Sequence, residues 1–355
     1  MLESEQPVDE LVALLREEHP LYDRLGSFEI LRIRGSLLLA LGERGLADLA
    51  LPYVLEELES AHDPYLTAVA ARVLRTTSPR AAFAAPLLDA LLYIRQRDDV
   101  VRLDAYGGYG STGESTTATA EVLRTIGWLA EEGRAALPRL RALRDERPGP
   151  VTVAAVEDAI AAIEVAPGRS AGCCCSPAEP SLQTEPTHTS LPADLYGVEF
   201  EDQDGVRLRF EEFFVGRPAI VVFFYTRCDN PTKCALTISK LGRLRRLLRD
   251  EGLDDDVRTA AITYDPAFDL PDRMTQYARS WGAPTGADHR MLRTTDDFSV
   301  VKTHFELGVN YGPSLVNRHR LEAYVLGPDG TIAASVTRLR WSERDLIDRA
   351  VALRV

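Results

Sequence analysis

Apolar residues recur at helical spacing through residues 1–165, in segments rich in Ala, Leu, Arg and Glu. Positions three and four apart share one face of a helix, so this spacing predicts amphipathic helices and almost no strands. The connections are short and carry turn residues such as Asp63-Pro64 and Pro148-Gly149-Pro150. The expected helices cover residues 28–42, 46–60, 65–76, 81–95, 117–131, 134–145 and 150–164.

A short phrase recurs at the start of three of these helices: Ala50-Leu51-Pro52, Ala85-Pro86 and Ala136-Leu137-Pro138, each with Leu or Val within the next two residues. Proline is tolerated in a first turn because that N–H has no intrahelical partner. The arrangement resembles a HEAT-like helical repeat, in which each helix pair buries its apolar face on the next. Such stacks usually bind proteins, so we expect this half to dock a protein client. A plain helical bundle is the alternative, since the Gly/Tyr/Ser-rich residues 97–116 interrupt the pattern as an expected contact loop.

Residues 166–190 are rich in Pro, Ser, Thr and Gly and nearly lack large apolar groups. Such a composition cannot bury a core and predicts a flexible linker. The linker carries Cys173, Cys174 and Cys175, and also His188. Adjacent cysteines do not all reach one tetrahedral ion without strain, but two of them can capture a soft metal or exchange a disulfide. The triplet is therefore interpreted as a set of accessory thiols, with a passive tether as the alternative.

From Leu191 onward, strand patterns alternate with helix patterns, which is typical of an α/β domain. The continuous apolar run AIVVFFY at 219–225 predicts a central strand buried on both faces. Further strands are expected at 206–210, 257–263, 321–326 and 331–336, and helices at 234–250, 270–281 and 342–353. We therefore predict two domains, an all-α repeat domain at 1–165 and an α/β domain at 191–355, joined by the linker.

The chain carries a net charge of -13, which argues against a nucleic-acid partner because such proteins cluster Lys and Arg. The sequence contains no run of about 18 apolar residues, so we expect no membrane-spanning helix. The N-terminal MLESEQPVDE lacks the basic and apolar regions of a secretory signal, so a cytoplasmic location is expected. In that compartment the five cysteines are expected to be thiols, metal ligands or catalytic groups.

Cys228 follows the buried strand and Cys234 begins the next expected helix. A thiol at such a junction is stabilised as a thiolate by the helix dipole and free N–H groups. Arg227 and Lys233 add positive charge beside the two sulfurs. This order of strand, cysteine and helix is that of thioredoxin-like redox and metal sites. The alternative is a pair of small buried hydrophobic residues.

Three segments in order resemble the SCO/SenC copper chaperones, thioredoxin-fold proteins associated with assembly of the copper centre of cytochrome oxidase. They are FFYTRCDNPTKCALTISKL (223–241), ITYDPAFDLPDRMTQYARSWG (262–282) and NRHRLEAYVLGPDGTI (317–332). The resemblance implies a thioredoxin-like fold for the C-terminal half and copper bound by Cys228, Cys234 and His319. Asp265 would support the site without being a ligand. Five residues separate the two cysteines here, whereas the family usually has three.

Two thiolates and an imidazole are donors that select Cu(I) and can also hold Cu(II). We therefore expect a copper-binding protein that acts as a metallochaperone or metal-site assembly factor. Two alternatives stay open: a thiol–disulfide oxidoreductase or peroxidase that uses the Cys228/Cys234 pair without metal, and a binding scaffold in which the pair is vestigial. For His319 the alternative is a surface histidine between Arg318 and Arg320, and His289 and His304 are expected to serve solvent or packing roles.

Overall fold

The structure is a computed structural model, and it describes residues 7–103, 115–166, 191–312, 316–337 and 341–354. Contacts within the chain divide it into two compact units. The first contains residues 1–21 and 25–180, and the second contains residues 22–24 and 181–355. Among the described residues, no helix is both long and apolar enough to cross a membrane.

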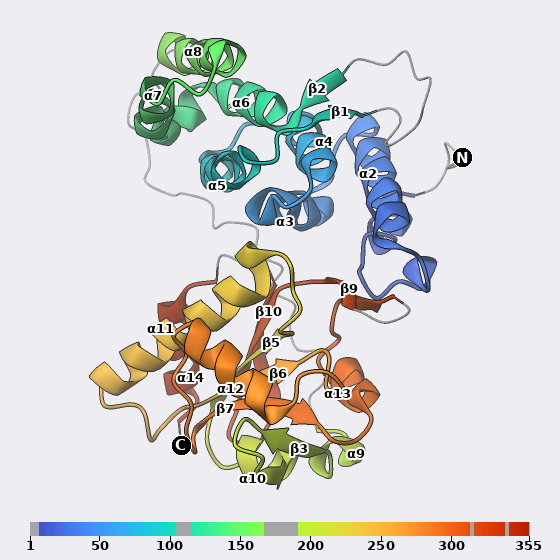
Figure 1. The fold of residues 1–355 in the computed structure, drawn as a ribbon, viewed down its shortest axis with the longest axis vertical. Helices are drawn as coiled ribbons and strands as arrows, with labels where there is room; N and C mark the ends of the chain where they lie inside the picture. The colour runs from blue at the N-terminus through green and yellow to red at the C-terminus, as the bar shows by residue number, and fades with distance from the viewer. Residues whose placement is uncertain (1–6, 104–114, 167–190, 313–315, 338–340, 355) are drawn as a thin grey trace. The chain divides into compact units, whose positions relative to one another are not determined.

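The N-terminal unit is helical, and all seven expected helices are present (Figure 1). Their bounds are α2 (Ser27–Glu43), α3 (Leu51–Ser60), α4 (Pro64–Leu74), α5 (Ala84–Ile94), α6 (Ala118–Trp128), α7 (Leu137–Asp145) and α8 (Pro150–Val165). Short 3-10 turns precede several of them, at η2 (Asp48–Ala50), η3 (Ala81–Phe83) and η4 (Ala130–Ala136). A further helix, α1 (Val8–Ala13), and a 3-10 turn, η1 (Pro20–Tyr22), were not predicted.

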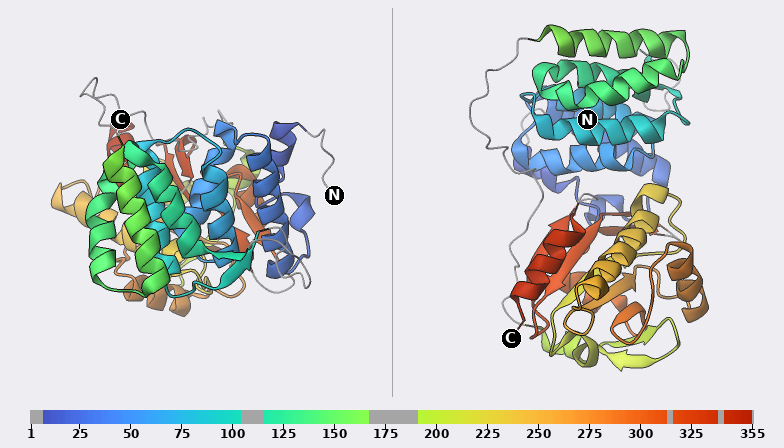
Figure 2. Two further views of the ribbon diagram at one scale, coloured as in Figure 1. Left: turned by 90° about the horizontal axis from the view of Figure 1, so that it is seen from above. Right: turned by 90° about the vertical axis from the view of Figure 1, so that its left-hand side faces the viewer.

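The helices of this unit pack in a regular order (Figure 2). Each of α2, α4 and α6 packs on the next even-numbered helix, so that α2, α4, α6 and α8 form one row. The neighbouring helix of each pair packs alongside, as α3 does on α4, α5 on α6 and α7 on α8. One apolar core is shared by these helices and includes the buried residues Leu38, Leu66, Leu87, Val122 and Ile160.

The expected loop at 97–116 is in part a two-stranded hairpin, which corrects the prediction of a loop without strands. β1 (Val100–Arg102) pairs antiparallel with β2 (Ser115–Thr117), so Val101 lies opposite Thr116. The strands are only three residues long, too short for either to produce a local strand pattern. Residues 104–114 between them, expected to form a contact loop, lie outside the described residues.

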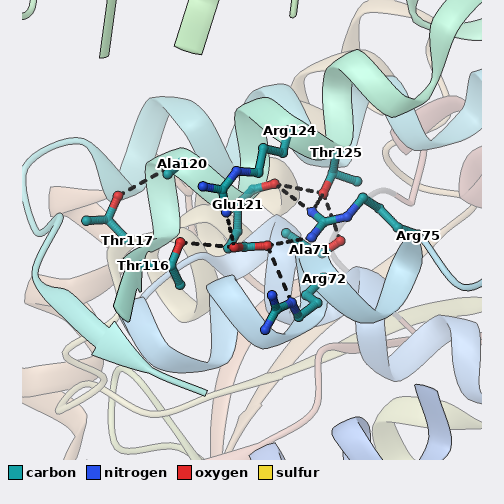
Figure 3. Close-up of polar contacts among 9 residues, drawn as sticks. All are labelled: Ala71, Arg72, Arg75, Thr116, Thr117, Ala120, Glu121, Arg124 and Thr125. Atoms are coloured by element: carbon teal, nitrogen blue, oxygen red, sulfur yellow. Dashed lines mark hydrogen bonds and ion pairs between the residues drawn. The ribbon is translucent and has the colours of Figure 1, made fainter. Parts of the chain in front are cut away.

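A buried carboxylate ties this hairpin to the helices (Figure 3). Glu121 of α6 is fully buried and accepts hydrogen bonds from Arg75 Nη2 at 2.6 Å, Arg124 Nη1 at 2.7 Å and Thr116 Oγ1 at 2.9 Å. Arg72 of α4 lies within 4.0 Å as a more distant ion pair. A buried charge is tolerated only when it is paired and hydrogen-bonded, and Glu121 meets both conditions.

The C-terminal unit is built on a seven-stranded sheet in the order β11-β10-β5-β6-β7-β3-β4 (Figure 1). The central strands β5 (Ala219–Phe224), β6 (Arg258–Thr263) and β7 (His289–Thr294) are parallel. The flanking strands β3 (Glu199–Asp202), β4 (Arg207–Arg209), β10 (Glu322–Leu326) and β11 (Ile332–Thr337) run antiparallel to their neighbours. A separate pair, β8 (Val309–Tyr311) and β9 (Val316–His319), completes the strands of the described residues.

Helices cover both faces of the sheet. α11 (Leu236–Asp250) and α14 (Glu343–Ala352) pack on each other and on β5. Successive strand residues point to opposite faces. Phe224 stacks on Tyr277 of α12 (Pro271–Ser280), while Phe223 contacts Phe305, which follows α13 (Phe298–His304) on the other face. Two short helices, α9 (Ala193–Tyr196) and α10 (Phe210–Phe214), complete the unit, which is thioredoxin-like in arrangement.

The predicted strands and helices of this half are present within a few residues of their expected bounds. The buried run at 219–225 is strand β5, and all six of its residues are buried, as predicted. The sequence did not predict β3, β7, α13, β8 or β9. The expected helix at 234–250 also begins differently, because a π-helical turn, η5 (Pro231–Ala235), precedes α11.

Candidate metal centre

Three sulfur and nitrogen donors from two distant segments meet beyond the carboxyl end of β5. Cys228 lies in the loop after the strand, Cys234 in the π-helical turn η5, and His319 at the end of β9. One donor atom from each lies within 4.8 Å of the others. Cys234 and His319 are buried, with 0% and 3% exposure, whereas Cys228 is partly exposed. The described part of the chain holds this one group of three such residues.

The imidazole of His319 is held with one nitrogen toward the sulfurs. Its Nε2 lies 3.6 Å from Cys228 Sγ and 3.3 Å from Cys234 Sγ. Its Nδ1 lies 3.0 Å from the carbonyl oxygen of Arg320, which can only accept, so Nδ1 carries a proton and donates it there. A backbone partner of this kind fixes the tautomer of a metal-binding histidine and leaves Nε2 as the donor to the ion.

This donor set fits a soft metal ion. Ligand atoms on one ion lie roughly 3.5–4 Å apart, given metal–sulfur bonds of about 2.3 Å and metal–nitrogen bonds of about 2.0–2.1 Å. The His319–sulfur distances of 3.3 and 3.6 Å are close to this range. Thiolates select Cu(I), Zn²⁺ and iron–sulfur clusters, and the added imidazole suits copper and zinc. The structure therefore holds a group that can bind a metal.

The two thiols differ sharply in acidity. The pKa of Cys228 is lowered to about 3, chiefly because the Cys234 thiol donates a hydrogen bond to its sulfur; burial opposes this, and His319 lowers the pKa further. Burial raises the pKa of Cys234 well above its ordinary value, and the charge of Cys228 adds to the effect. Without metal, the pair is therefore a Cys228 thiolate beside a Cys234 thiol.

A buried aspartate in the turn between β6 and α12 holds the loop that carries Cys228. Asp269 Oδ2 accepts from the Thr226 N–H at 3.1 Å, and its carboxylate also accepts from the hydroxyls of Thr226 and Thr263. Burial raises the pKa of Asp269, and these hydrogen bonds act in the opposite direction. Asp269 was not predicted from the sequence, although it lies four positions after Asp265 in the same DPAFD turn.

Asp265, expected to support the site, contacts the residue before Cys228. Its Oδ2 accepts from Arg227 Nε at 3.1 Å. The same guanidinium lies 3.9 Å from the centre of the Phe268 ring, and Arg273 lies 3.8 Å from that ring. Asp265 is thus a neighbour of the loop and not a member of the donor group. The Arg227–Asp265 contact restrains the loop next to Cys228.

The segment between the cysteines is also tied to the histidine. Lys233 is buried at 6% exposure, and its Nζ donates to the His319 carbonyl oxygen at 2.9 Å. The Asn230 side chain accepts a hydrogen bond from the Thr232 N–H at 3.0 Å and thereby caps the N-terminus of the π-helical turn. Single π turns frequently occur at functional sites. The five-residue spacing is accommodated by this turn, which brings Cys234 back to His319.

Of the remaining candidates from the sequence, the two that the structure describes, His289 and His304, are not part of this group. Cys173, Cys174, Cys175 and His188 lie outside the described residues. His304 is buried and packs against the rings of Phe210 and Phe305, and His289 lies at the start of β7.

The C-terminal half of the chain is similar to one known protein family. Residues 192–352 match the family model described as SCO1/SenC. No curated protein matches the chain.

Solved structures similar to the chain include three of this family, each covering less than half of it. A SCO1/SenC family lipoprotein from Bacillus anthracis is 18% identical, with 45% of this chain and 95% of that chain covered and a TM-score of 0.39. ScoI from Bradyrhizobium japonicum with copper bound is 19% identical, with coverages of 44% and 96% and a TM-score of 0.35. Yeast Sco1 with copper bound is 23% identical, with coverages of 44% and 88% and a TM-score of 0.35.

Proposed function

We propose that this chain, whose residues 192–352 form a SCO1/SenC domain, binds one copper ion through Cys228, Cys234 and His319. The observation that carries the proposal is the orientation of His319, whose Nε2 lies within 3.6 Å of both sulfurs while Nδ1 donates to the Arg320 carbonyl. The buried ring and the Cys228 thiolate arrange the donors before the ion arrives. Copper would supply a redox-active centre with labile thiolate bonds.

Exposure of Cys228 supports a role in metal transfer. Cys234 and His319 are buried, so an incoming ligand from another protein meets the partly exposed Cys228 sulfur first. A metal ion whose ligands can be exchanged one at a time is readily passed to another protein. We infer a metallochaperone or metal-site assembly factor whose client is a protein with its own soft-metal site.

The N-terminal unit is proposed to dock that client as a HEAT-like repeat. Support comes from the recurring Ala-Leu-Pro and Ala-Pro helix starts and from the packing of α2 on α4, α4 on α6 and α6 on α8. Helical repeats of this kind present extended surfaces to protein partners. Deleting residues 1–165 should leave copper binding intact while slowing transfer to the client.

The test of copper binding is titration of the reduced full-length protein with Cu(I) against a competing chelator. The expected stoichiometry is one ion per chain. Cys228→Ser/Cys234→Ser should abolish this tight binding and His319→Ala should weaken it. The matched control replaces Cys173, Cys174 and Cys175 with serine and should retain the tight equivalent. Stoichiometric tight binding by the Cys228/Cys234 double variant would reject the proposed site.

Thiol–disulfide exchange without metal is a second candidate, favoured by the low pKa of Cys228 beside the protonated Cys234. The Cys228 thiolate would attack a substrate disulfide, forming a mixed disulfide and releasing one substrate thiolate. Cys234, losing its proton, would then displace the second thiolate, leaving a Cys228–Cys234 disulfide and a reduced substrate. Turnover of a disulfide substrate by the metal-free protein, coupled to a dithiol reductant, distinguishes this activity from copper binding alone.

A further inference from the structure

The donor group of the candidate metal centre suits ions of different charge. Two thiolates and an imidazole can bind copper or Zn²⁺. With both thiolates bound, Cu(I) leaves the group with a net negative charge, whereas Zn²⁺ or Cu(II) leaves it neutral. A fixed charge beside the donors therefore favours one kind of ion over the other, although it is not itself a ligand.

Lys233 places a positive charge next to the donors. It is the residue before Cys234, and it is buried, with 6% exposure. Its Nζ donates to the His319 carbonyl oxygen at 2.9 Å, so Lys233 is covalently joined to one ligand residue and hydrogen-bonded to another. Burial raises the pKa of Cys234, and the charge of Lys233 opposes this rise, so the charge reaches the sulfur. A buried charge is screened much less than an exposed one.

Other charged groups also lie near the centre, but they do not depend on Lys233. Arg227 donates to one carboxylate and Arg320 to another, so each pair adds little net charge at the donors. Asp269 is buried and is held by the N–H and hydroxyl of Thr226. These groups are the same whichever ion is bound, and they stay in place when Lys233 alone is replaced.

Given the copper function proposed for this site, on which this inference rests, we propose that Lys233 makes the centre selective for Cu(I) over Zn²⁺ and Cu(II). The ammonium group stabilises the negatively charged Cu(I) complex more than the neutral complex of a divalent ion. Ligand type alone does not provide this selectivity, because thiolates and imidazole also suit Zn²⁺. The lysine lies in the five-residue segment between the cysteines, so the same segment closes the site and supplies its charge.

Competition titrations of the reduced full-length protein, with one chelator for Cu(I) and another for Zn²⁺, measure the Kd of each ion. The ratio of the two Kd values reports the preference for Cu(I), and a general loosening of the site, which weakens both ions alike, does not change it. Lys233→Met removes the charge and keeps an unbranched apolar side chain, and it should lower the preference by about tenfold or more. Lys233→Gln should lower it similarly, whereas Lys233→Arg should retain most of it.

A matched control and a second readout separate the charge effect from damage to the fold. Arg249→Met removes a cation whose side chain is 62% exposed, near the far end of α11, and should leave the ratio unchanged. The Cu(II)/Cu(I) potential should fall in Lys233→Met, by about 59 mV for each tenfold loss of preference for Cu(I) over Cu(II).

The possible failures are distinguishable. An unchanged ratio in folded Lys233→Met and Lys233→Gln would overturn the selectivity role of Lys233 and leave the copper site in place. Tight Cu(I) binding that survives Cys228→Ser/Cys234→Ser would instead overturn the proposed copper site, and with it the role of Lys233.

Discussion

Asp269 accepts hydrogen bonds from both the backbone N–H and the hydroxyl of Thr226, two residues before Cys228. The same carboxylate accepts from Thr263, the last residue of β6. The loop that carries the exposed sulfur is therefore fixed to the neighbouring central strand. A metal site depends on such supporting contacts as well as on its ligands.

Asp269→Ala should loosen this loop, because it leaves the Thr226 N–H without its acceptor. We expect a loss of about 2–4 kcal/mol in the free energy of unfolding and a fall of about tenfold or more in Cu(I) affinity. Chemical denaturation and competitive Cu(I) titration measure the two effects. Gln276→Ala, at an exposed position in the middle of α12, is the control and should change neither. Unchanged copper affinity in folded Asp269→Ala protein would show that Asp269 stabilises the fold but does not support copper binding.

The acidity of Cys228 predicts its reaction with iodoacetamide in the metal-free, reduced protein. Its pKa is lowered to about 3, so the thiolate is present from about pH 5 to 8 and the alkylation rate should be nearly flat there. An ordinary cysteine, with a pKa of about 8.5, reacts about tenfold faster per pH unit over this range. Peptide mass spectrometry separates Cys228 from the other thiols.

A matched pair of variants tests the cause of that acidity. Cys234→Ala removes the hydrogen bond to the Cys228 sulfur and should restore a rate that rises with pH. Cys234→Ser keeps a donor at the same position and should leave the profile closer to flat. Equal profiles for the two variants would show that Cys234 does not lower the pKa of Cys228.

The Glu121 network predicts acid sensitivity of the N-terminal unit. Burial alone would raise the pKa of Glu121, but hydrogen bonds and charges from Arg75, Thr116 and Arg72 lower it overall. A carboxyl with a lowered folded pKa contributes stability above its unfolded pKa, and this is lost as pH falls through the folded value. Glu121→Gln should therefore remove roughly 2–4 kcal/mol at neutral pH and less in acid.

Hydrogen exchange of α4 and α6 amides at pH 7 and in acid measures this loss locally. Glu157→Gln, at an exposed position of α8, is the control and should leave exchange unchanged. Equal protection of α6 in Glu121→Gln and in the unmodified protein at pH 7 would contradict the prediction.

Close packing at Gly242 predicts a second stability effect, in the C-terminal unit. A Cβ there would lie 2.3 Å from the Gly282 carbonyl oxygen, so Gly242→Ala must push α11 away from that segment. Overpacking of this kind typically costs about 1–3 kcal/mol. Gly197→Ala is the control, because nothing lies within 4 Å of its Cβ position. Thermal unfolding of both variants should show a lower Tm for Gly242→Ala alone.

The local pattern of apolar residues was sufficient to predict the elements that are stabilised mainly by burying their own apolar side chains. The seven N-terminal helices follow from helical spacing, and β5 follows from its continuous apolar run. Cys228 and Cys234 were identified because a strand and a helix bracket them in the sequence. His319 was not evident from pattern, since its partners lie 85 and 91 residues away; the family resemblance supplied it.

Elements held by distant polar contacts escaped the sequence analysis. β7 contains Arg290 and Arg293, which make it look exposed, yet it lies inside the sheet between β6 and β3. Its arginines pair with Asp202 and Glu201 of β3, about 90 residues earlier in the chain. Asp269 was missed for the same reason, because its role depends on Thr226, 43 residues away. Such pairings appear only once the chain is folded.

X-ray absorption at the copper edge tests the central claim most directly. Protein loaded with one equivalent of Cu(I) should show two sulfur ligands and one imidazole nitrogen, and His319→Ala should lose the imidazole scattering while keeping both sulfurs. An environment of sulfur alone in the unmodified protein, or an imidazole signal that survives His319→Ala, would contradict binding by Cys228, Cys234 and His319.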